Sequence, residues 1–413
     1  MEFNANGAEK VSWRNISVII FGLAIWGPFV SAINVYWDVF LYKLGATPII
    51  ISIIATASGT TGLVASIYGG YLADRFGRRK IIVSMSYVLA MVYLLFYFAK
   101  NWIHILFIVM IFGLTSIYYP ALQAIIADSA PLEKRGRIFS IISLVSSLTS
   151  IVAPLIAYRY VESIGIVEGM KELFFLAFLT GTLTSTARLI FIEETLRVEH
   201  KEHESILSSY KEAIRLLRER AVRPILFICI RNLMWGIIYL IQLYTMLYLG
   251  INYMLWALIQ MIVMILTAIT SIPAGIITDR FGRRKTTIIG TIISLFGISC
   301  LAFTPRESAF IYVLCGLSLL TITNVIIANS ISTMVVDLMP PEIRGRGYAT
   351  LSVIVFPVYI CGVLIGGILY TYHPRIPFIL AVFIVAITII VSLILPETLM
   401  RKKDKHTQQS LLT

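Results

Sequence analysis

Long apolar stretches, separated by short polar segments, run along almost the whole chain. A helix that crosses the hydrocarbon core of a bilayer needs about 20 mainly apolar residues. Twelve stretches meet this requirement, at residues 15–42, 47–72, 81–99, 103–127, 138–160, 172–193, 224–248, 253–277, 286–304, 308–336, 347–371 and 376–395. The pattern therefore predicts an all-α membrane protein with twelve transmembrane helices.

A charged stretch, residues 194–223, separates the first six predicted spans from the last six. We predict an N-terminal half at 1–193, a linker at 194–223, a C-terminal half at 224–399 and a tail at 400–413. Within the linker, apolar residues recur at helical spacing between 206 and 217. This periodicity predicts one or two short amphipathic helices on the cytoplasmic surface.

Composition supports the membrane assignment and gives an orientation. Of the 413 residues, 58% are hydrophobic and 14% charged, against roughly 45–50% and 25% in soluble domains. The net charge is +12, yet 26 of the 34 lysines and arginines fall on one side, six in the opposite loops and two within spans. The positive-inside rule then places both termini in the cytoplasm of a cell (plasma) membrane protein. The basic charge needs no nucleic-acid partner.

Three motifs occur twice in the same order. The heptapeptide Asp74–Lys80 returns unchanged as Asp279–Lys285, Asp128–Arg137 is matched by Asp337–Arg346, and Glu194-Thr195-Leu196 is matched by Glu397-Thr398-Leu399. The offsets are 205, 209 and 203 residues. Such a repeat predicts two pseudo-symmetric six-helix halves related by an axis along the membrane normal.

These motifs resemble those of the major facilitator superfamily, and within it the sugar porters. Gly70-x3-Asp74-Arg75-x-Gly77-Arg78-Arg79 is similar to the superfamily signature between spans two and three, and Pro396-Glu397-Thr398 to the end of the sugar-porter twelfth span. The sequence departs from the sugar porters in using aspartate for glutamate twice and in lacking a glutamine pair in span seven. The resemblance implies a secondary transporter with the major facilitator fold, acting by alternating access as a monomer without a cofactor.

The repeated charges are candidates for a cytoplasmic gate. Carboxylates at helix ends can form charge-assisted hydrogen bonds with nearby arginines and can cap helix N-termini. In the superfamily such clusters form when the cytoplasmic side closes. The predicted gate residues are Asp74, Arg75, Gly77, Arg78, Arg79, Asp128, Arg135, Asp279, Arg280, Gly282, Arg283, Arg284, Asp337, Arg344 and Glu397. The alternative is that they are topogenic charges joined by structural salt bridges.

A polar and aromatic stripe in span seven is the candidate substrate site. An ionisable side chain inside a span is costly and marks a functional-site candidate, and Arg231 is the most informative one. The predicted substrate residues are Arg231, Asn232, Trp235, Tyr239 and Gln242, with Tyr118, Tyr119 and Gln123 of span four. Alternatively, Arg231 extends to the cytoplasmic surface. We expect Arg188 in span six to do this too, or to pair with Glu193.

Asp38 is the acid nearest the outer end of a span and is the candidate proton-coupling residue for symport. A carboxylate in a partly apolar cavity is more easily protonated than one in water. The alternative is an interface residue that pairs with Lys43. Proton-coupled sugar porters pair such an aspartate with an arginine in span four, and this sequence has no arginine there.

We interpret the sequence as a transporter of a small polar solute, either a sugar or a related metabolite. An organic-anion or carboxylate transporter using Arg231, an exporter of amphipathic compounds, and a non-transporting receptor on the same fold are the alternatives. The spans offer no catalytic cluster and no nucleotide-binding loop, so we predict no enzymatic activity. Glu199, His200, Glu202 and His203 have metal-ligand spacing, but on a charged loop we interpret them as a solvated face and predict no metal.

Overall fold

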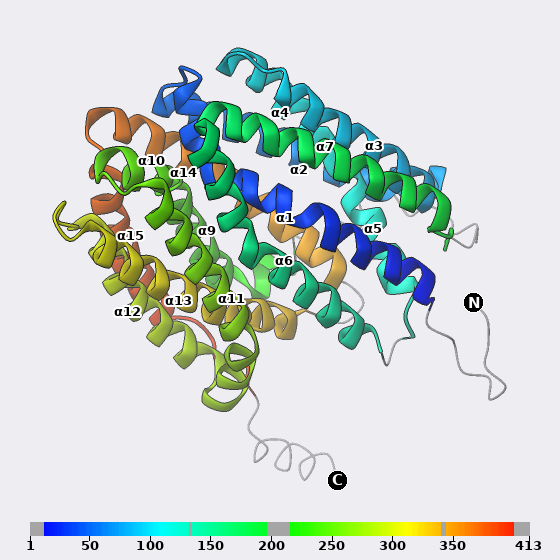
Figure 1. Cartoon of the computed structure of the whole chain (residues 1–413). Helices are drawn as coiled ribbons and strands as arrows, with labels where there is room; N and C mark the ends of the chain where they lie inside the picture. The colour runs from blue at the N-terminus through cyan, green and yellow to red at the C-terminus, as the bar shows by residue number, and fades with distance from the viewer. Residues whose placement is uncertain (1–11, 132–133, 196–214, 216, 340–343, 400–413) are drawn as a thin grey trace, which may run out of the picture. The chain divides into compact units, whose positions relative to one another are not determined.

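Helices account for nearly all of the chain in a computed structural model, which describes residues 12–131, 134–195, 215, 217–339 and 344–399. No strand occurs in these described ranges. The helices are α1 (Trp13–Lys43), α2 (Pro48–Phe76), α3 (Arg78–Tyr97), α4 (Trp102–Leu114), α5 (Tyr118–Asp128), α6 (Arg135–Ile164), α7 (Ile166–Phe191), α9 (Val222–Ile237), α10 (Ile241–Leu243), α11 (Tyr253–Phe281), α12 (Arg283–Ala302), α13 (Ala309–Leu338), α14 (Arg344–Tyr372) and α15 (Ile376–Leu393) (Figure 1).

The predicted spans are confirmed as helices of membrane-crossing length. Among the described residues, eleven helices are long and apolar enough to cross a membrane, and a bent pair of helices, taken as one span, makes the twelfth. The fourth span is continuous from α4 to α5 through a short 3-10 turn at Thr115–Ile117. The predicted linker helices at 206–217 fall mostly outside the described residues.

The seventh span differs from the single helix predicted at 224–248. Helix α9 ends at Ile237, and the span resumes as α10 and a π-helix at Tyr244–Tyr248. The break coincides with a change of packing partner, because the chain after Ile238 belongs to a different compact unit from the chain before it. Periodicity alone cannot reveal such a break, since both segments are apolar.

The chain packs as two compact units. The first contains the described residues between 12 and 195 with Tyr239–Ile265 and Gly366–Pro374, and the second contains the rest, including 217–238, Leu266–Ile365 and 375–399. These packing units depart from the predicted halves at the two inserted segments. The predicted division at residues 193 and 224 follows the sequence repeat and not the packing. It therefore stays a prediction.

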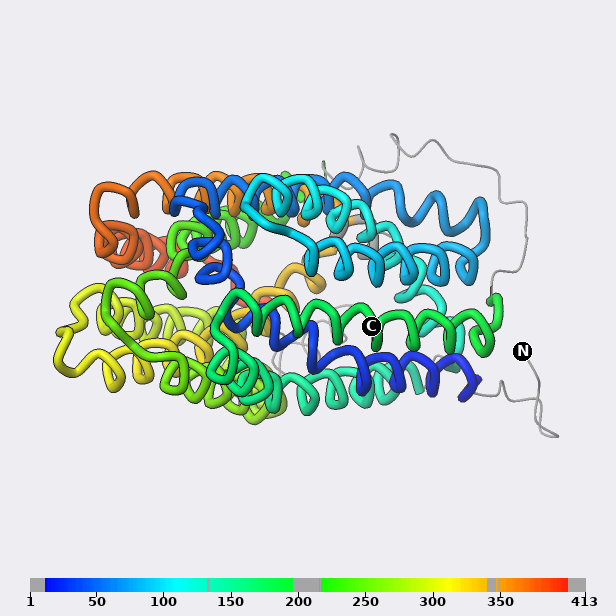
Figure 2. The backbone as a smooth tube through the Cα atoms, turned by 45° about the horizontal axis from the view of Figure 1, so that its top comes forward, coloured from blue at the N-terminus to red at the C-terminus, as the bar shows by residue number. Residues whose placement is uncertain are grey.

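Neighbouring helices pack closely within each unit. In the first, α1 packs against α6 and α7, α3 against α7, and α2 against α4; in the second, α12 packs against α13 and α15. The tube in Figure 2 shows α12 and α13 running side by side. Small residues permit this in membranes: a methyl group at Gly236 of α9 would lie 2.3 Å from the Tyr359 carbonyl oxygen of α14.

Candidate functional site

A capped turn joins α2 to α3 in the first unit. Gly77 has φ +94°, a conformation that favours glycine, and α3 begins at the next residue. The Glu194 carboxylate accepts a 3.0 Å hydrogen bond from the Arg79 backbone N–H, one of the unpaired donors at the start of α3. A methyl group at Gly77 would come within 2.8 Å of this carboxylate. The turn therefore needs glycine both for its backbone and for the space it leaves.

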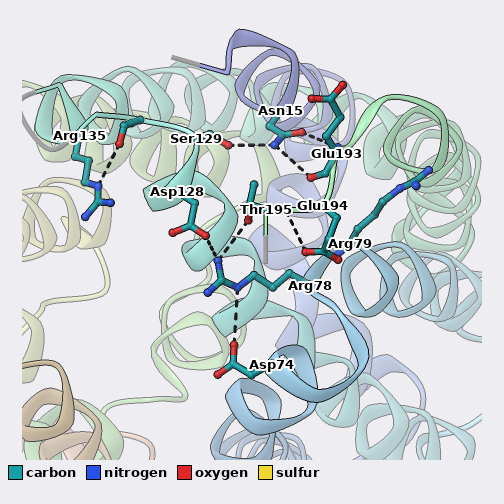
Figure 3. Close-up of polar contacts among 11 residues, drawn as sticks. Asn15, Asp74, Arg78, Arg79, Asp128, Ser129, Arg135, Glu193, Glu194 and Thr195 are labelled. Atoms are coloured by element: carbon teal, nitrogen blue, oxygen red, sulfur yellow. Dashed lines mark hydrogen bonds and ion pairs between the residues drawn. The ribbon is translucent and has the colours of Figure 1, made fainter. Parts of the chain in front are cut away.

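Arg78 connects this turn to the end of α5 (Figure 3). Its guanidinium forms an ion pair with Asp128 and donates a 3.3 Å hydrogen bond to the Thr195 hydroxyl. Asp74 lies farther away, with its carboxylate 3.9 Å from Arg78 Nε. The Asp74 side chain is 65% exposed and that of Arg78 only 16%. Asp128 is therefore the principal ionic partner of Arg78.

The first helix is tied to the same region through Asn15, which is fully buried. Its amide donates to Ser129 Oγ at 3.1 Å and accepts from the Glu193 backbone N–H at 2.8 Å (Figure 3). The Glu193 carboxylate pairs with Arg14 at 2.5 Å. The predicted pairing of Glu193 with Arg188 is therefore wrong: Arg14 occupies that carboxylate.

The second unit repeats the capped turn. Gly282 has φ +92°, and the Glu397 carboxylate accepts hydrogen bonds from the backbone N–H groups of Arg283 and Arg284 at 3.0 and 3.2 Å. The Arg283 guanidinium pairs with Asp337 and donates to the Thr398 hydroxyl at 2.8 Å. The glutamate cap, the arginine–aspartate pair and the arginine–threonine hydrogen bond each match one in the first unit, so the three repeated motifs form the same kind of cluster twice.

The glutamates, rather than the first aspartates, cap α3 and α12. Asp279, like Asp74, is exposed and precedes the turn. Glu194 was missed as a site residue, although the repeated Glu-Thr-Leu triplet was a signal for it. Glu397 was among the predicted gate residues and lies in the cluster.

Of four other predicted gate arginines, three contact neutral groups and one has a side chain outside the described residues. The Arg75 and Arg280 guanidinium groups lie 5.5 and 5.8 Å from the ring centres of Phe76 and Phe281. Arg135 Nε donates to the Ala130 carbonyl at 3.3 Å, whereas the side chain of Arg344 lies outside the described residues. The role of the whole set as a gate stays a prediction.

A second group surrounds Asp38 near the other end of α1, within the first unit. Asp38 is buried, and its carboxylate accepts a hydrogen bond from the Tyr239 hydroxyl at 3.4 Å. Lys43 is exposed, and the described residues show no Asp38–Lys43 ion pair. Asp38 is therefore not an exposed interface residue neutralised by Lys43.

Gln242 is inserted into the backbone of α1 beside Asp38. Tyr36 has non-helical dihedral angles, and the Gln242 carbonyl accepts from the backbone N–H groups of Asp38 and Val39 at 2.6 and 3.2 Å. Its amide N–H₂ donates to the carbonyls of Asn34, at 3.5 Å, and Val35. These four groups would pair with each other in an unbroken helix. In this conformation the side chain binds backbone, so a substrate role for Gln242 would require its release.

Arg231 forms a third group in the second unit. Its guanidinium donates to the Asn324 side-chain carbonyl of α13, and no ion pair to a carboxylate is found for it within the described ranges. Trp235, one turn along α9, has a buried indole N–H without an acceptor in the described structure. Asn232 donates to the Ile228 carbonyl within its own helix at 2.9 Å. Arg231 is partly buried and is held by Asn324, so it does not extend freely to the surface.

The aromatic residues predicted in span four lie in the first unit. The Tyr118 and Tyr119 ring centres are 4.4 Å apart; Tyr118 is buried and Tyr119 exposed. Gln123 is exposed on α5. The Arg188 guanidinium, which we predicted to extend to the surface, instead is buried and lies 5.9 Å from the Tyr118 ring centre. The predicted substrate residues thus fall into separate local groups in both units.

Metal-ligating side chains do not gather in the structure: no group of three or more histidines, cysteines or acids that could hold an ion occurs among the described residues. The sequence Glu199, His200, Glu202 and His203 lies outside them.

Comparisons with known proteins give a consistent family. The model of the Major Facilitator Superfamily matches residues 15–268 and 225–412. A Na(+), Li(+), K(+)/H(+) antiporter of Planococcus maritimus is 28% identical over 162 residues, which is 36% of this chain and 34% of the relative. The chain thus spans about a third of that relative's length. Multidrug resistance protein MdtG of Proteus mirabilis is 23% identical over 364 residues, 81% of this chain and 84% of the relative.

The fold is likewise similar to that of solved structures. The crystal structure of a D-xylose-proton symporter has a TM-score of 0.75 with 14% identity, covering 94% of this chain and 99% of the symporter. At this identity the likeness concerns the fold alone.

Proposed function

Because the chain belongs to the Major Facilitator Superfamily, we propose that it carries a small solute with an anionic group across the cell membrane by alternating access. Transport is the function common to its family; the anionic cargo is the finer part of the proposal. The observation that carries it is the environment of Arg231, a cation within a membrane span whose hydrogen-bond partner is the neutral amide of Asn324.

The free-energy cost of burying a charge explains why this environment matters. An ionised group away from water is costly unless a charge or several hydrogen bonds compensate it. The guanidinium presents donors in a planar fork that matches a carboxylate or phosphate, and the indole N–H of Trp235 lies one turn away on the same helix. A solute carboxylate would supply the missing negative charge and accept these donors.

The residues that resemble the sugar porters do not bear on the cargo. Asp128, Asp337, Glu397 and Thr398 all belong to the two clusters at helix ends. These residues join helix ends within each unit. They are therefore evidence for the transport mechanism and not for a sugar as the cargo. A neutral sugar is the second candidate, because the chain shares its fold with a D-xylose-proton symporter.

The two clusters support a role as the cytoplasmic gate. Each contains an arginine whose charge is neutralised by one aspartate and whose helix is capped by a glutamate. We propose that these contacts rearrange as the transporter opens, with both termini in the cytoplasm. Asp38 is the proposed proton site, because it is a buried carboxylate whose described hydrogen-bond partner is a tyrosine hydroxyl. We further propose that a single chain suffices for transport.

A binding screen tests the cargo. Purified full-length protein is heated with sugars, organic acids or phosphate, and the same screen is run with Arg231→Ala. Losing a buried charge-paired contact costs about 2 kcal/mol or more, so we expect anions to stabilise the wild type and their affinity for Arg231→Ala to fall by about 30-fold. Arg223→Ala, which alters an exposed arginine of the same helix, should bind like the wild type. Equal stabilisation of wild type and Arg231→Ala by neutral sugars alone would remove the anion proposal.

A further inference from the structure

Helices α1 and α7 meet in the first unit around a second buried arginine, Arg188. The residue is 3% exposed, and its guanidinium donates a 2.6 Å hydrogen bond to the Ser86 hydroxyl of α3. Its Nε–H is buried without an acceptor in the described structure. Ser86 is itself neutral and donates to the Ile82 carbonyl. The positive charge of Arg188 thus has no ion pair among the described residues.

Two more buried donors lack acceptors beside it. The hydroxyl of Thr184 and the indole N–H of Trp26 are both unpaired in the described structure, with their residues 1% and 9% exposed. An unsatisfied buried polar group costs about 1–3 kcal/mol, and native structures contain few of them. Three unsatisfied donors on the facing sides of α1 and α7 therefore require an explanation.

Thr184 is unusual within its own helix. The other hydroxyl side chains of this part of α7 all donate to the backbone carbonyl four residues earlier, namely Thr180, Thr182, Ser185 and Thr186. This local bond is the usual way for a helical hydroxyl to be satisfied in an apolar setting. The Thr184 hydroxyl does not make it, so its proton is available to another acceptor.

Two glycines let α1 and α7 approach each other closely beside these donors. A methyl group at Gly22 of α1 would lie 2.7 Å from Thr184 Cγ2 and 3.5 and 3.9 Å from two nitrogens of Arg188, and a methyl group at Gly181 of α7 would lie 3.2 Å from the Trp26 indole nitrogen. Gly181, Thr184 and Arg188 share one face of α7 at helical spacing. The long arginine side chain points back toward this face, as helical side chains do.

The repeated architecture does not require this arginine. When the two Glu-Thr-Leu triplets are aligned, position 188 corresponds to Val391, a buried residue of the apolar core of the second unit. A valine therefore suits the same place in the other copy. The charge at Arg188 is a feature that the first unit has in addition to the shared fold.

We propose that Arg188, Thr184 and Trp26 form a binding site for a small monovalent anion, halide-sized or a single carboxylate group. All three contribute donors, the guanidinium supplies the opposite charge, and the glycine faces limit the ligand to a small one. The site lies within the first unit and is separate from Arg231, which belongs to the second unit. It does not depend on the proposed cargo.

The test measures thermal unfolding of the purified full-length protein in detergent. Sodium isethionate, whose anion is a sulfonate, is replaced stepwise by chloride or by acetate at constant sodium and ionic strength, so that general screening stays fixed. A ligand that binds the folded state stabilises it by RT ln(1 + [L]/Kd), so the melting temperature rises with the logarithm of its concentration above Kd. We expect a rise that follows this law with at least one of the two anions; chloride identifies an inorganic ligand, and a response to acetate alone identifies a carboxylate.

Variants assign the response to the site. Loss of one hydrogen bond to a charged partner weakens binding by about tenfold, so Thr184→Val and Trp26→Phe should raise the Kd fitted from the melting temperatures by about that factor. Arg188→Met should abolish the response, and the two milder variants decide the matter if it fails to fold. Thr388→Val is the matched control, because Thr388 is equally buried but satisfied by the Ile384 carbonyl.

The outcomes separate this site from the proposed cargo site. The response should persist in Arg231→Ala. A response lost in Arg231→Ala but unchanged in Thr184→Val and Trp26→Phe would overturn the proposal and assign the anion to Arg231. The absence of any rise in melting temperature with chloride or acetate would also overturn it.

Discussion

The hydrogen bonds that Gln242 makes to α1 can be removed by the change Gln242→Leu. Leucine keeps much of the side-chain volume but can neither accept nor donate. The backbone N–H groups of Asp38 and Val39 then lose their acceptor, and the Asn34 carbonyl loses its donor. The Val35 carbonyl keeps a partner, because the Trp256 indole N–H also donates to it at 2.8 Å.

The size of the effect follows from these distances. The bond to the Asp38 N–H is short at 2.6 Å, while those to Val39 and Asn34 are longer at 3.2 and 3.5 Å. A buried backbone group left unpaired costs about 1–3 kcal/mol. One strong and two weaker losses together give about 2–4 kcal/mol. We expect the equilibrium for opening this contact to rise by about 30- to 1,000-fold.

Amide hydrogen exchange reads this equilibrium directly. Peptides covering residues 34–43 should exchange faster in Gln242→Leu by the same factor, because exchange follows the population of the open form. Gln260→Leu is the matched control: Gln260 lies on α11 in the same unit, and its side chain makes no hydrogen bond in the described structure. Unchanged exchange at Asp38 and Val39 in Gln242→Leu would refute the reasoning.

Three further predictions concern the helix ends and Asp38. Gly282→Ala should destabilise the protein by about 1–2 kcal/mol, because of the positive φ and the 2.6 Å approach to Glu397, whereas Gly275→Ala, with open space around it, should not; thermal unfolding of both variants measures this. Glu397→Gln should lower stability by about 1 kcal/mol through the weakened cap, and an equal effect from the exposed Asp74→Asn would contradict that cause. Asp38→Asn should make uptake into proteoliposomes insensitive to an imposed pH gradient; wild-type uptake that ignores the gradient would remove Asp38 as the proton site.

The spans and the helix-end clusters were predictable because their causes are local or repeated. Bilayer thickness imposes about 20 apolar residues on each span, which made the twelve segments visible. The duplicated motifs pointed to charged clusters at matching helix ends, and the pairs Arg78–Asp128 and Arg283–Asp337 confirm that these residues meet. The repeated Glu-Thr-Leu triplet also marked Glu194 as a site residue. The predicted gate instead relied on the aspartates.

The groups within the spans were not predictable, because their partners are distant in the chain. The break in α1 occurs at Tyr36, and the side chain inserted there, Gln242, comes from more than 200 residues later. Arg188 is similar. Its neighbours come from α1, α3 and α5, and no spacing in the sequence relates them.

Four arginines in the described structure divide into two kinds by their partners. Arg78 and Arg283, at helix ends, each pair with an aspartate. Arg188 and Arg231, inside spans, have the neutral partners Ser86 and Asn324. A charged side chain in a membrane span costs free energy, and a hydrogen bond to a neutral group offsets only part of it. Folding alone would favour an apolar residue at such a position, as Val391 illustrates. The two proposals share this premise: each adds a ligand whose negative charge would complete the compensation that Ser86 and Asn324 begin.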